Sequence, residues 1–121
     1  MAIHKILLVD DSPADLLHLK NAVNGVNATI VTATSGQDAI DTAISEKPDL
    51  IFMDIVMEGL DGYSACRELK KNAATSQIPV VFVSTKNQRA DRMWAERQGG
   101  IGYVTKPFTP EQIVGEVKRF N

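Results

Sequence analysis

Three aspartates in this sequence stand directly after short apolar runs. Asp10 and Asp11 follow the first run, and Asp54 follows Leu50–Met53 and precedes a loop punctuated by glycines. A short apolar run bounded by turn-forming residues is typical of a strand buried on both faces of a parallel sheet. Open α/β sheets carry their chemistry at the carboxyl ends of such strands. We therefore interpret Asp54 as a nucleophile that accepts a phosphoryl group.

Clustered carboxylates need compensating positive charge. Two like charges about 4 Å apart repel by roughly 4 kcal/mol at an effective dielectric constant of about 20. Mg²⁺ would relieve this repulsion, because it typically binds one or two carboxylates together with water and phosphate oxygens. Lys106, after the last strand, supplies a second positive charge, and Ser84, at the end of another, offers a hydroxyl to an incoming oxyanion. These groups suit phosphoryl transfer, in which positioning and charge neutralisation dominate.

Each of these residues also has an ordinary structural explanation. A single aspartate at a strand end is more often a helix cap or a turn former, and the pair Asp10-Asp11 begins a helix favourably with respect to its dipole. Ser84 and Lys106 taken alone indicate almost nothing. The hypothesis depends on their joint placement, each after a different predicted strand.

Strands and helices alternate along the chain. Branched apolar runs predict strands at residues 5–10, 29–33, 49–54, 78–84 and 102–105. Apolar residues at helical spacing predict a helix after each, the fourth at residues 87–98. This alternation predicts an α/β fold, a doubly wound five-stranded parallel sheet with five helices on its two faces. Right-handed crossovers favour the flavodoxin-like strand order 2-1-3-4-5, which puts Asp10, Asp11 and Asp54 in one crevice.

The first helix is expected to begin at the sequence Ser12-Pro13-Ala14-Asp15. Ser12 suits the capping position, Pro13 suits the first turn, and Asp15 completes a box-like Ser-x-x-Asp pattern. Gly25 is expected to end this helix.

Length and composition restrict the class of protein. At 121 residues the chain suits a single domain, residues 1–121, and no linker leaves room for an output domain. The net charge of −2 predicts neither nucleic-acid binding nor affinity for anionic lipid. One cysteine, Cys66, excludes an internal disulfide. Without a signal-peptide pattern or an apolar run of about 18 residues, we expect a cytoplasmic protein with no membrane insertion.

The sequence resembles response-regulator receiver domains, which are CheY-like, over its full length. The matching motifs are Asp10-Asp11, Asp54 with Gly59 and Asp61-Gly62, Ser84-Thr85, Tyr103 and Lys106-Pro107-Phe108. The resemblance implies that Asp54 takes phosphate from the phosphohistidine of a histidine kinase or a phosphotransfer domain. It also implies that Asp11, Asp54 and the backbone carbonyl of Val56 bind Mg²⁺, with Asp10 acting through water.

The same resemblance implies a switch. Lys106 would hold the phosphoryl oxygens, Ser84 would bond to them on activation, and Tyr103 would swing inward when Ser84 moves. The Lys106-Pro107 peptide is expected to be cis. The only chemistry expected of the chain is phosphotransfer to itself and autodephosphorylation, so it is not expected to be an enzyme in the ordinary sense.

Two residues depart from the family pattern beside the predicted site. Glu58 stands where the family usually has proline, and Lys86 stands two residues after Ser84, where small residues are common. Val56 and Lys86 flank the position that an attacking water would use. We expect Val56, Glu58 and Lys86 to tune the lifetime of the phosphorylated form.

A narrower likeness is to the single-domain, CheY-like regulators of twitching motility (the PilH group). It rests on Ser84–Gln88, Asp91, Trp94, Arg97-Gln98-Gly99 and Tyr103–Pro107. This favours a role in type IV pilus control or a related chemotaxis-like pathway. Met93 and Trp94, at helical spacing with Ala90, are expected to be core residues.

A downstream target protein is expected on the face formed by the fourth helix, the fifth strand and the fifth helix. Arg92, Lys118 and Arg119 are the exposed candidates for contacting it. The protein itself is expected to be a monomer or a weak dimer.

Three alternatives stay open. A flavodoxin would share the fold, but its first loop must receive the phosphate of FMN, which the acidic stretch Asp10–Asp15 would repel. A haloacid-dehalogenase-type phosphatase also uses an aspartyl nucleophile, but it needs a second aspartate two residues on, where Val56 stands. The third alternative is a receiver that serves as a phosphate sink or as a docking module independent of phosphorylation.

Overall fold

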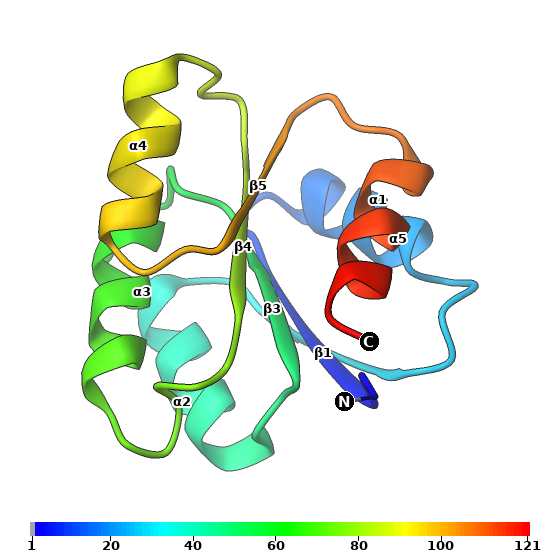
Figure 1. Ribbon diagram of the computed structural model, residues 1–121, viewed down its shortest axis with the longest axis horizontal. Coiled ribbons are helices and arrows are strands. Elements are labelled where there is room, and N and C mark those ends of the chain that lie inside the picture. The colour runs from blue at the N-terminus through cyan, green and yellow to red at the C-terminus, as the bar shows by residue number, and fades with distance from the viewer. Residues whose placement is uncertain (1) are drawn as a thin grey trace.

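Five parallel strands form a central sheet, and helices cover both of its faces (Figure 1). The computed structural model describes residues 2–121. In chain order the elements are β1 Lys5–Val9, α1 Pro13–Ala22, β2 Thr29–Ala33, α2 Gly36–Glu46, β3 Leu50–Met53, α3 Gly62–Lys71, β4 Val80–Ser84, α4 Arg89–Arg97, β5 Gly102–Thr105 and α5 Pro110–Arg119. The strand order is β2-β1-β3-β4-β5 with every pair parallel, which confirms the fold class predicted from the sequence.

The two faces of the sheet carry separate apolar clusters. Helices α2, α3 and α4 cover one face and α1 and α5 cover the other, as Figure 1 shows. In β1, Leu7 joins the first cluster and Leu8 the second; in β3, Ile51 and Phe52 divide in the same way. Because successive side chains of a strand point to opposite faces, a strand covered on both sides must be apolar throughout.

Strand register aligns the carboxyl ends of the central strands. Val9 at the end of β1 pairs with Met53 at the end of β3, so the next residues, Asp10 and Asp54, leave the sheet side by side. Ser84 at the end of β4 pairs with the last residue of β5. The acidic residues, the hydroxyl and the lysine after β5 are therefore carried to the same edge of the sheet.

The start of α1 differs from the predicted capping box. Ser12 caps the helix, because its Oγ accepts the N–H of Asp15 at 3.3 Å. The reciprocal bond is absent: the N–H of Ser12 donates to Asp10 Oδ1 at 2.9 Å, and the carboxylate of Asp15 turns elsewhere. The helix ends at Ala22, three residues before Gly25.

The prediction that Met93 and Trp94 are core residues is wrong. Met93 is 50% exposed and Trp94 is 47% exposed. Ala95 is instead the buried residue of α4, and Gln98, the first residue after the helix, is also buried. The buried stripe is therefore rotated by one residue from the predicted one.

The remaining differences between the predicted and the observed elements concern where strands and helices begin and end. The strands expected at 5–10, 49–54 and 78–84 are shorter, and the helix expected at 87–98 covers Arg89–Arg97. The cis peptide between Lys106 and Pro107 is present. Within residues 2–121, no helix has both the length and the apolar character that crossing a membrane requires.

Candidate functional site

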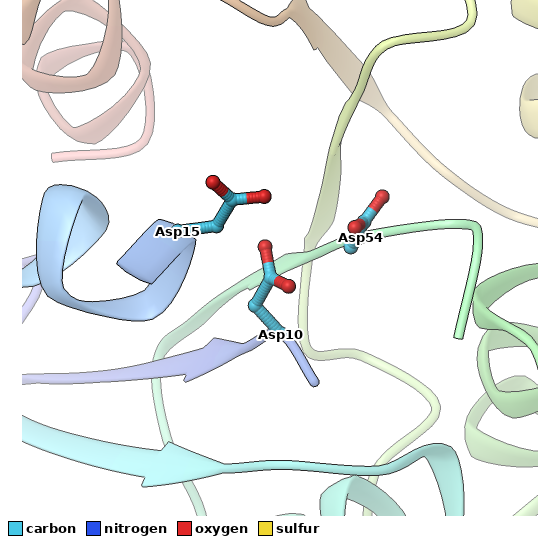
Figure 2. A group of neighbouring side chains, drawn as sticks. All are labelled: Asp10, Asp15 and Asp54. Carbon is cyan, nitrogen blue, oxygen red and sulfur yellow. The ribbon is translucent and has the colours of Figure 1, made fainter. Parts of the chain in front are cut away.

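The ammonium group of Lys106 lies among three carboxylates at the carboxyl edge of the sheet. Its Nζ is 2.8 Å from Asp10 Oδ2, 2.9 Å from Asp15 Oδ2 and 3.1 Å from Asp54 Oδ2. Figure 2 shows the three aspartates gathered from three elements: the end of β1, the first turn of α1 and the end of β3. An ammonium has three N–H groups, so each of its donors has one carboxylate acceptor.

Asp54 is buried in this arrangement but reaches the surface. Its Oδ1 accepts the N–H of Ile55 at 2.7 Å, and its Oδ2 accepts from Lys106. Burial raises the pKa of Asp54 above its ordinary value, and the positive charge of Lys106 offsets part of this rise. A carboxylate held by a lysine at the mouth of a site is suited to nucleophilic attack.

Lys106 stays charged. Burial alone would lower the pKa of its amine, but hydrogen bonds to Asp10 and Asp15 and the charge of Asp54 raise it above its ordinary value. The backbone N–H of Lys106 also donates to the carbonyl of Ser84 at 2.8 Å, which fixes the start of its side chain at the end of β4. The lysine therefore brings a fixed positive charge to Asp54.

Asp11 lies outside the group that surrounds Lys106. Its side chain is exposed, and its Oδ2 accepts the backbone N–H of Glu58 at 3.0 Å. It thus ties the end of β1 to the loop that follows β3. The third carboxylate beside Lys106 is Asp15, which the sequence had suggested only as part of a capping pattern.

Gly62 lets the loop after β3 close against the site. A Cβ atom at this position would lie 2.1 Å from the carbonyl oxygen of Asp54 and 2.8 Å from the Cα of Ile55. The N–H of Gly62 donates to the carbonyl of Ile55 at 2.8 Å. The start of α3 therefore packs directly on the backbone that carries Asp54, which only glycine permits.

Ser84 and Tyr103 meet at the loop that follows β4. Ser84 is fully buried and its Oγ accepts the N–H of Lys86 at 3.3 Å. The phenol of Tyr103 donates to the carbonyl oxygen of Lys86 at 2.6 Å. The backbone of Lys86 thus connects the hydroxyl beside the site to the aromatic ring on β5.

Arg92 covers this ring. Its guanidinium carbon lies 4.8 Å from the centre of the Tyr103 ring, and its Nη2 donates to Thr105 Oγ1 at 2.9 Å. Arg119, another expected partner contact, pairs with Glu116 at 2.8 Å and also donates to the carbonyl of Ile101. Both arginines are exposed, yet each is also held by its own chain.

The donor set suits a hard divalent cation. Asp10, Asp15 and Asp54 form an acidic cluster in which one oxygen from each lies within 4.8 Å of the others. One lysine does not balance these three charges and the adjacent Asp11. Oxygen-rich sites with excess negative charge are those that Mg²⁺ occupies.

Comparison with known proteins identifies the family. Residues 6–118 match the family described as the response regulator receiver domain. Protein PilH of Pseudomonas aeruginosa is 44% identical over 110 residues, which cover 91% of this chain and 91% of PilH. The chemotaxis protein CheY4 of Vibrio cholerae has the same fold, with a TM-score of 0.91 at 22% identity over 99% of this chain and 100% of that one.

A second solved structure bears on the acidic cluster. It is the receiver domain of a sensor histidine kinase of Pseudomonas aeruginosa, with a magnesium ion coordinated in its active-site cleft. The two structures superpose with a TM-score of 0.89 at 26% identity, covering 98% of each chain. From the family match and the identity to PilH, the chain belongs to the response-regulator receiver family.

Proposed function

We propose that the protein is a phospho-accepting response regulator in which Asp54 takes a phosphoryl group from the phosphohistidine of a histidine kinase or a phosphotransfer domain. The observation that carries this is a buried carboxylate at the end of β3 whose Oδ2 lies 3.1 Å from the Lys106 ammonium. A bond forms between an Asp54 oxygen and phosphorus while the phosphorus–nitrogen bond breaks. The imidazole leaves with that electron pair.

The choice of Asp54 over its neighbour Asp10 follows from access. Asp10 is wholly buried, and its two oxygens accept from Ser12 and Lys106. Asp54 retains some exposure, so a donor phosphorus can reach it from solvent. Lys106 neutralises charge on the phosphoryl oxygens, which is the main contribution a protein makes to phosphoryl transfer.

We further propose that Asp11, Asp54 and the backbone carbonyl of Val56 hold Mg²⁺, with Asp10 acting through water. The bond from Glu58 N–H to Asp11 supports this, because it ties Asp11 to the loop that contains Val56. When bound, Mg²⁺ neutralises phosphoryl oxygens that one lysine cannot neutralise alone. Apart from accepting and losing its own phosphoryl group, the protein is proposed to catalyse no reaction.

The signal is proposed to leave through Ser84 and Tyr103. A phosphoryl group on Asp54 adds about −1.5 to −2 charges at the site. The hydroxyl of Ser84 turns to it and releases the N–H of Lys86, which alters the loop that also holds the Tyr103 phenol. A target protein binding the α4–β5–α5 face reads this change by population shift.

The pathway proposed is the control of twitching motility or a related chemotaxis-like response. The 44% identity to PilH supports this choice, together with the residues that the sequence shares with the PilH group. Val56, Glu58 and Lys86 are exposed around the site and are proposed to set the lifetime of the phosphorylated form.

Phosphorylation by acetyl phosphate with Mg²⁺, followed by mass spectrometry, tests the assignment. The wild-type protein and an Asp41→Asn control, altered at an exposed position of α2, should gain one phosphoryl group. Asp54→Asn should gain none, and phosphorylation of that variant would defeat the proposal. Comparing target affinity with and without beryllofluoride separates a signalling protein, whose affinity changes, from a phosphate sink or a docking module, whose affinity does not.

A further inference from the structure

Asp15 is linked to the site by a closed ring of hydrogen bonds. Ser12 N–H donates to Asp10, Asp15 N–H donates to Ser12, and Lys106 donates to both Asp10 and Asp15. The first turn of α1 is therefore built so that the Asp15 carboxylate faces the lysine that serves Asp54. Figure 2 shows this carboxylate beside those of Asp10 and Asp54.

The three partners of Lys106 differ in exposure. The side chain of Asp10 is 0% exposed and that of Asp54 is 11% exposed, whereas that of Asp15 is 47% exposed. An exposed carboxylate loses little when it returns to water, while a buried one is left without the cation that balances its charge. Asp15 is therefore the partner that Lys106 can release at the lowest cost.

The surroundings leave room for that release. A cavity of ≈ 290 Å³ lies between α1 and the segment after β5 and is lined by Asp15, His18, Thr85, Lys106, Pro107 and Phe108. Asp15 therefore borders open space, and its carboxylate is not enclosed by its neighbours.

An arriving phosphoryl group competes with Asp15 for the same lysine. All three N–H groups of Lys106 are matched by carboxylate oxygens. The oxygens of Asp15 and Asp54 also lie within 4.8 Å of each other, so negative charge added to Asp54 is repelled by Asp15. Both effects favour the form of the site without phosphate.

We propose that Asp15 is a positioning residue that acts through Lys106, holding the ammonium in the resting site and opposing occupation of Asp54 by a phosphoryl group. This inference rests on the proposed function of Asp54. Asp15 neither accepts the phosphoryl group nor contacts the donor. Its charge sets how readily the site is filled.

Titration with beryllofluoride at saturating Mg²⁺, followed by fluorine NMR, measures this directly. Asp15→Asn removes the charge with little change in shape, and it should bind beryllofluoride about two- to fivefold more tightly than the wild-type protein, which is the range expected for one partly exposed ion pair. Asp15→Glu keeps the charge and should bind like the wild type. Because loss of a carboxylate also weakens cation binding, the affinity for Mg²⁺ is measured separately by calorimetry so that saturation is assured.

Glu111→Gln is the matched control, since Glu111 is also an acidic residue in the first turn of a helix and makes no ion pair within residues 2–121. It should leave beryllofluoride affinity unchanged. Unchanged or weaker binding by Asp15→Asn overturns the inference, as does an Asp15→Glu variant that behaves like Asp15→Asn. A purely structural role for Asp15 would not tighten binding. If the wild-type protein binds Mg²⁺ but no beryllofluoride, the proposed function of Asp54 fails instead.

Discussion

Lys106 Nζ lies 3.1 Å from Asp54 Oδ2, although 52 residues separate the two in the chain. The contact exists because β4 lies between β3 and β5 and the three strands end at one edge of the sheet. The same lysine also contacts Asp10, which is 96 residues away. One side chain therefore connects the first, third and fifth strands at the point where the phosphoryl group is proposed to bind.

Replacing Lys106 with methionine should destabilise the protein, because buried Asp10 would then lose its cation. The expected loss in the free energy of unfolding is about 3–5 kcal/mol, the cost of removing one partner of a buried ion pair and leaving the other charge uncompensated. Urea denaturation measures it, and addition of Mg²⁺ should recover part of the loss. Lys20→Met, at an exposed position of α1, should change stability by less than about 0.5 kcal/mol. Equal losses in the two variants would mean that Lys106 is not the cation that stabilises this site.

Asp54→Asn should raise the stability of the metal-free protein at neutral pH. Burial raises the pKa of Asp54 above 3.8, so the folded state binds this proton more tightly than the unfolded chain does. The stability that this group contributes is present below pH 3.8 and is lost as the pH rises through its folded pKa. The variant does not undergo this loss, so its advantage should shrink as the pH is lowered to about 4. Urea denaturation at several pH values checks the trend; a variant less stable than wild type at pH 7 would contradict it.

Local patterns were sufficient for most of the architecture. The strands Thr29–Ala33 and Gly102–Thr105 begin and end where the sequence predicts, and alternation of strands with helices led to the correct order of the sheet. The other three strands are shorter than the sequence predicts. Hydrogen bonding between two strands stops where the shorter one ends, and a local sequence pattern contains no information about the neighbouring strand. Ile78 illustrates this, since its N–H donates to the carbonyl of Thr75 in a turn instead of joining β4.

The contact between Asp15 and Lys106 could not be predicted from a local sequence pattern. The spacing of Asp15 from Ser12 indicates a capping box, but its carboxylate bonds to Lys106, 91 residues away. Asp10 and Asp11 are neighbours in the sequence, and the sequence alone does not show which of the two faces Lys106. For α4 the sequence predicts a helix correctly but the wrong buried face. Ala90, Met93 and Trp94 are as regularly spaced as the residues that face the sheet, so spacing alone does not distinguish the two faces.

Gly62→Ala should destabilise the protein by about 1–3 kcal/mol, because the added methyl group would meet backbone atoms and not a movable side chain. The clash is with the carbonyl oxygen of Asp54, so beryllofluoride binding should weaken as well. Gly115→Ala is the control: a Cβ atom added there would have no contact within 4 Å outside its own helix, and the residue stands inside α5. There alanine should stabilise the helix by about 0.5–1 kcal/mol. Thermal denaturation of both variants, with opposite signs of shift, tests the pair.

Tyr103→Phe should loosen the loop that follows β4. The phenol donates to the carbonyl of Lys86 at 2.6 Å, and its loss should cost about 0.5–1.5 kcal/mol. Burial raises the pKa of Tyr103 to about 12, so the stability that comes from the neutral phenol is present below pH 10 and is lost as the pH rises toward 12.

Hydrogen exchange of residues 85–88 reports on this loop, and it should be faster in Tyr103→Phe than in the wild type. Tyr63→Phe is the matched control, because its phenol donates to the carbonyl of Asp91, at 3.2 Å, in α4 and not to a carbonyl of the loop. It should leave exchange at residues 85–88 unchanged. If both variants accelerate exchange there equally, the loop responds to the loss of either phenol hydroxyl, and the bond between Tyr103 and Lys86 is not what specifically holds it.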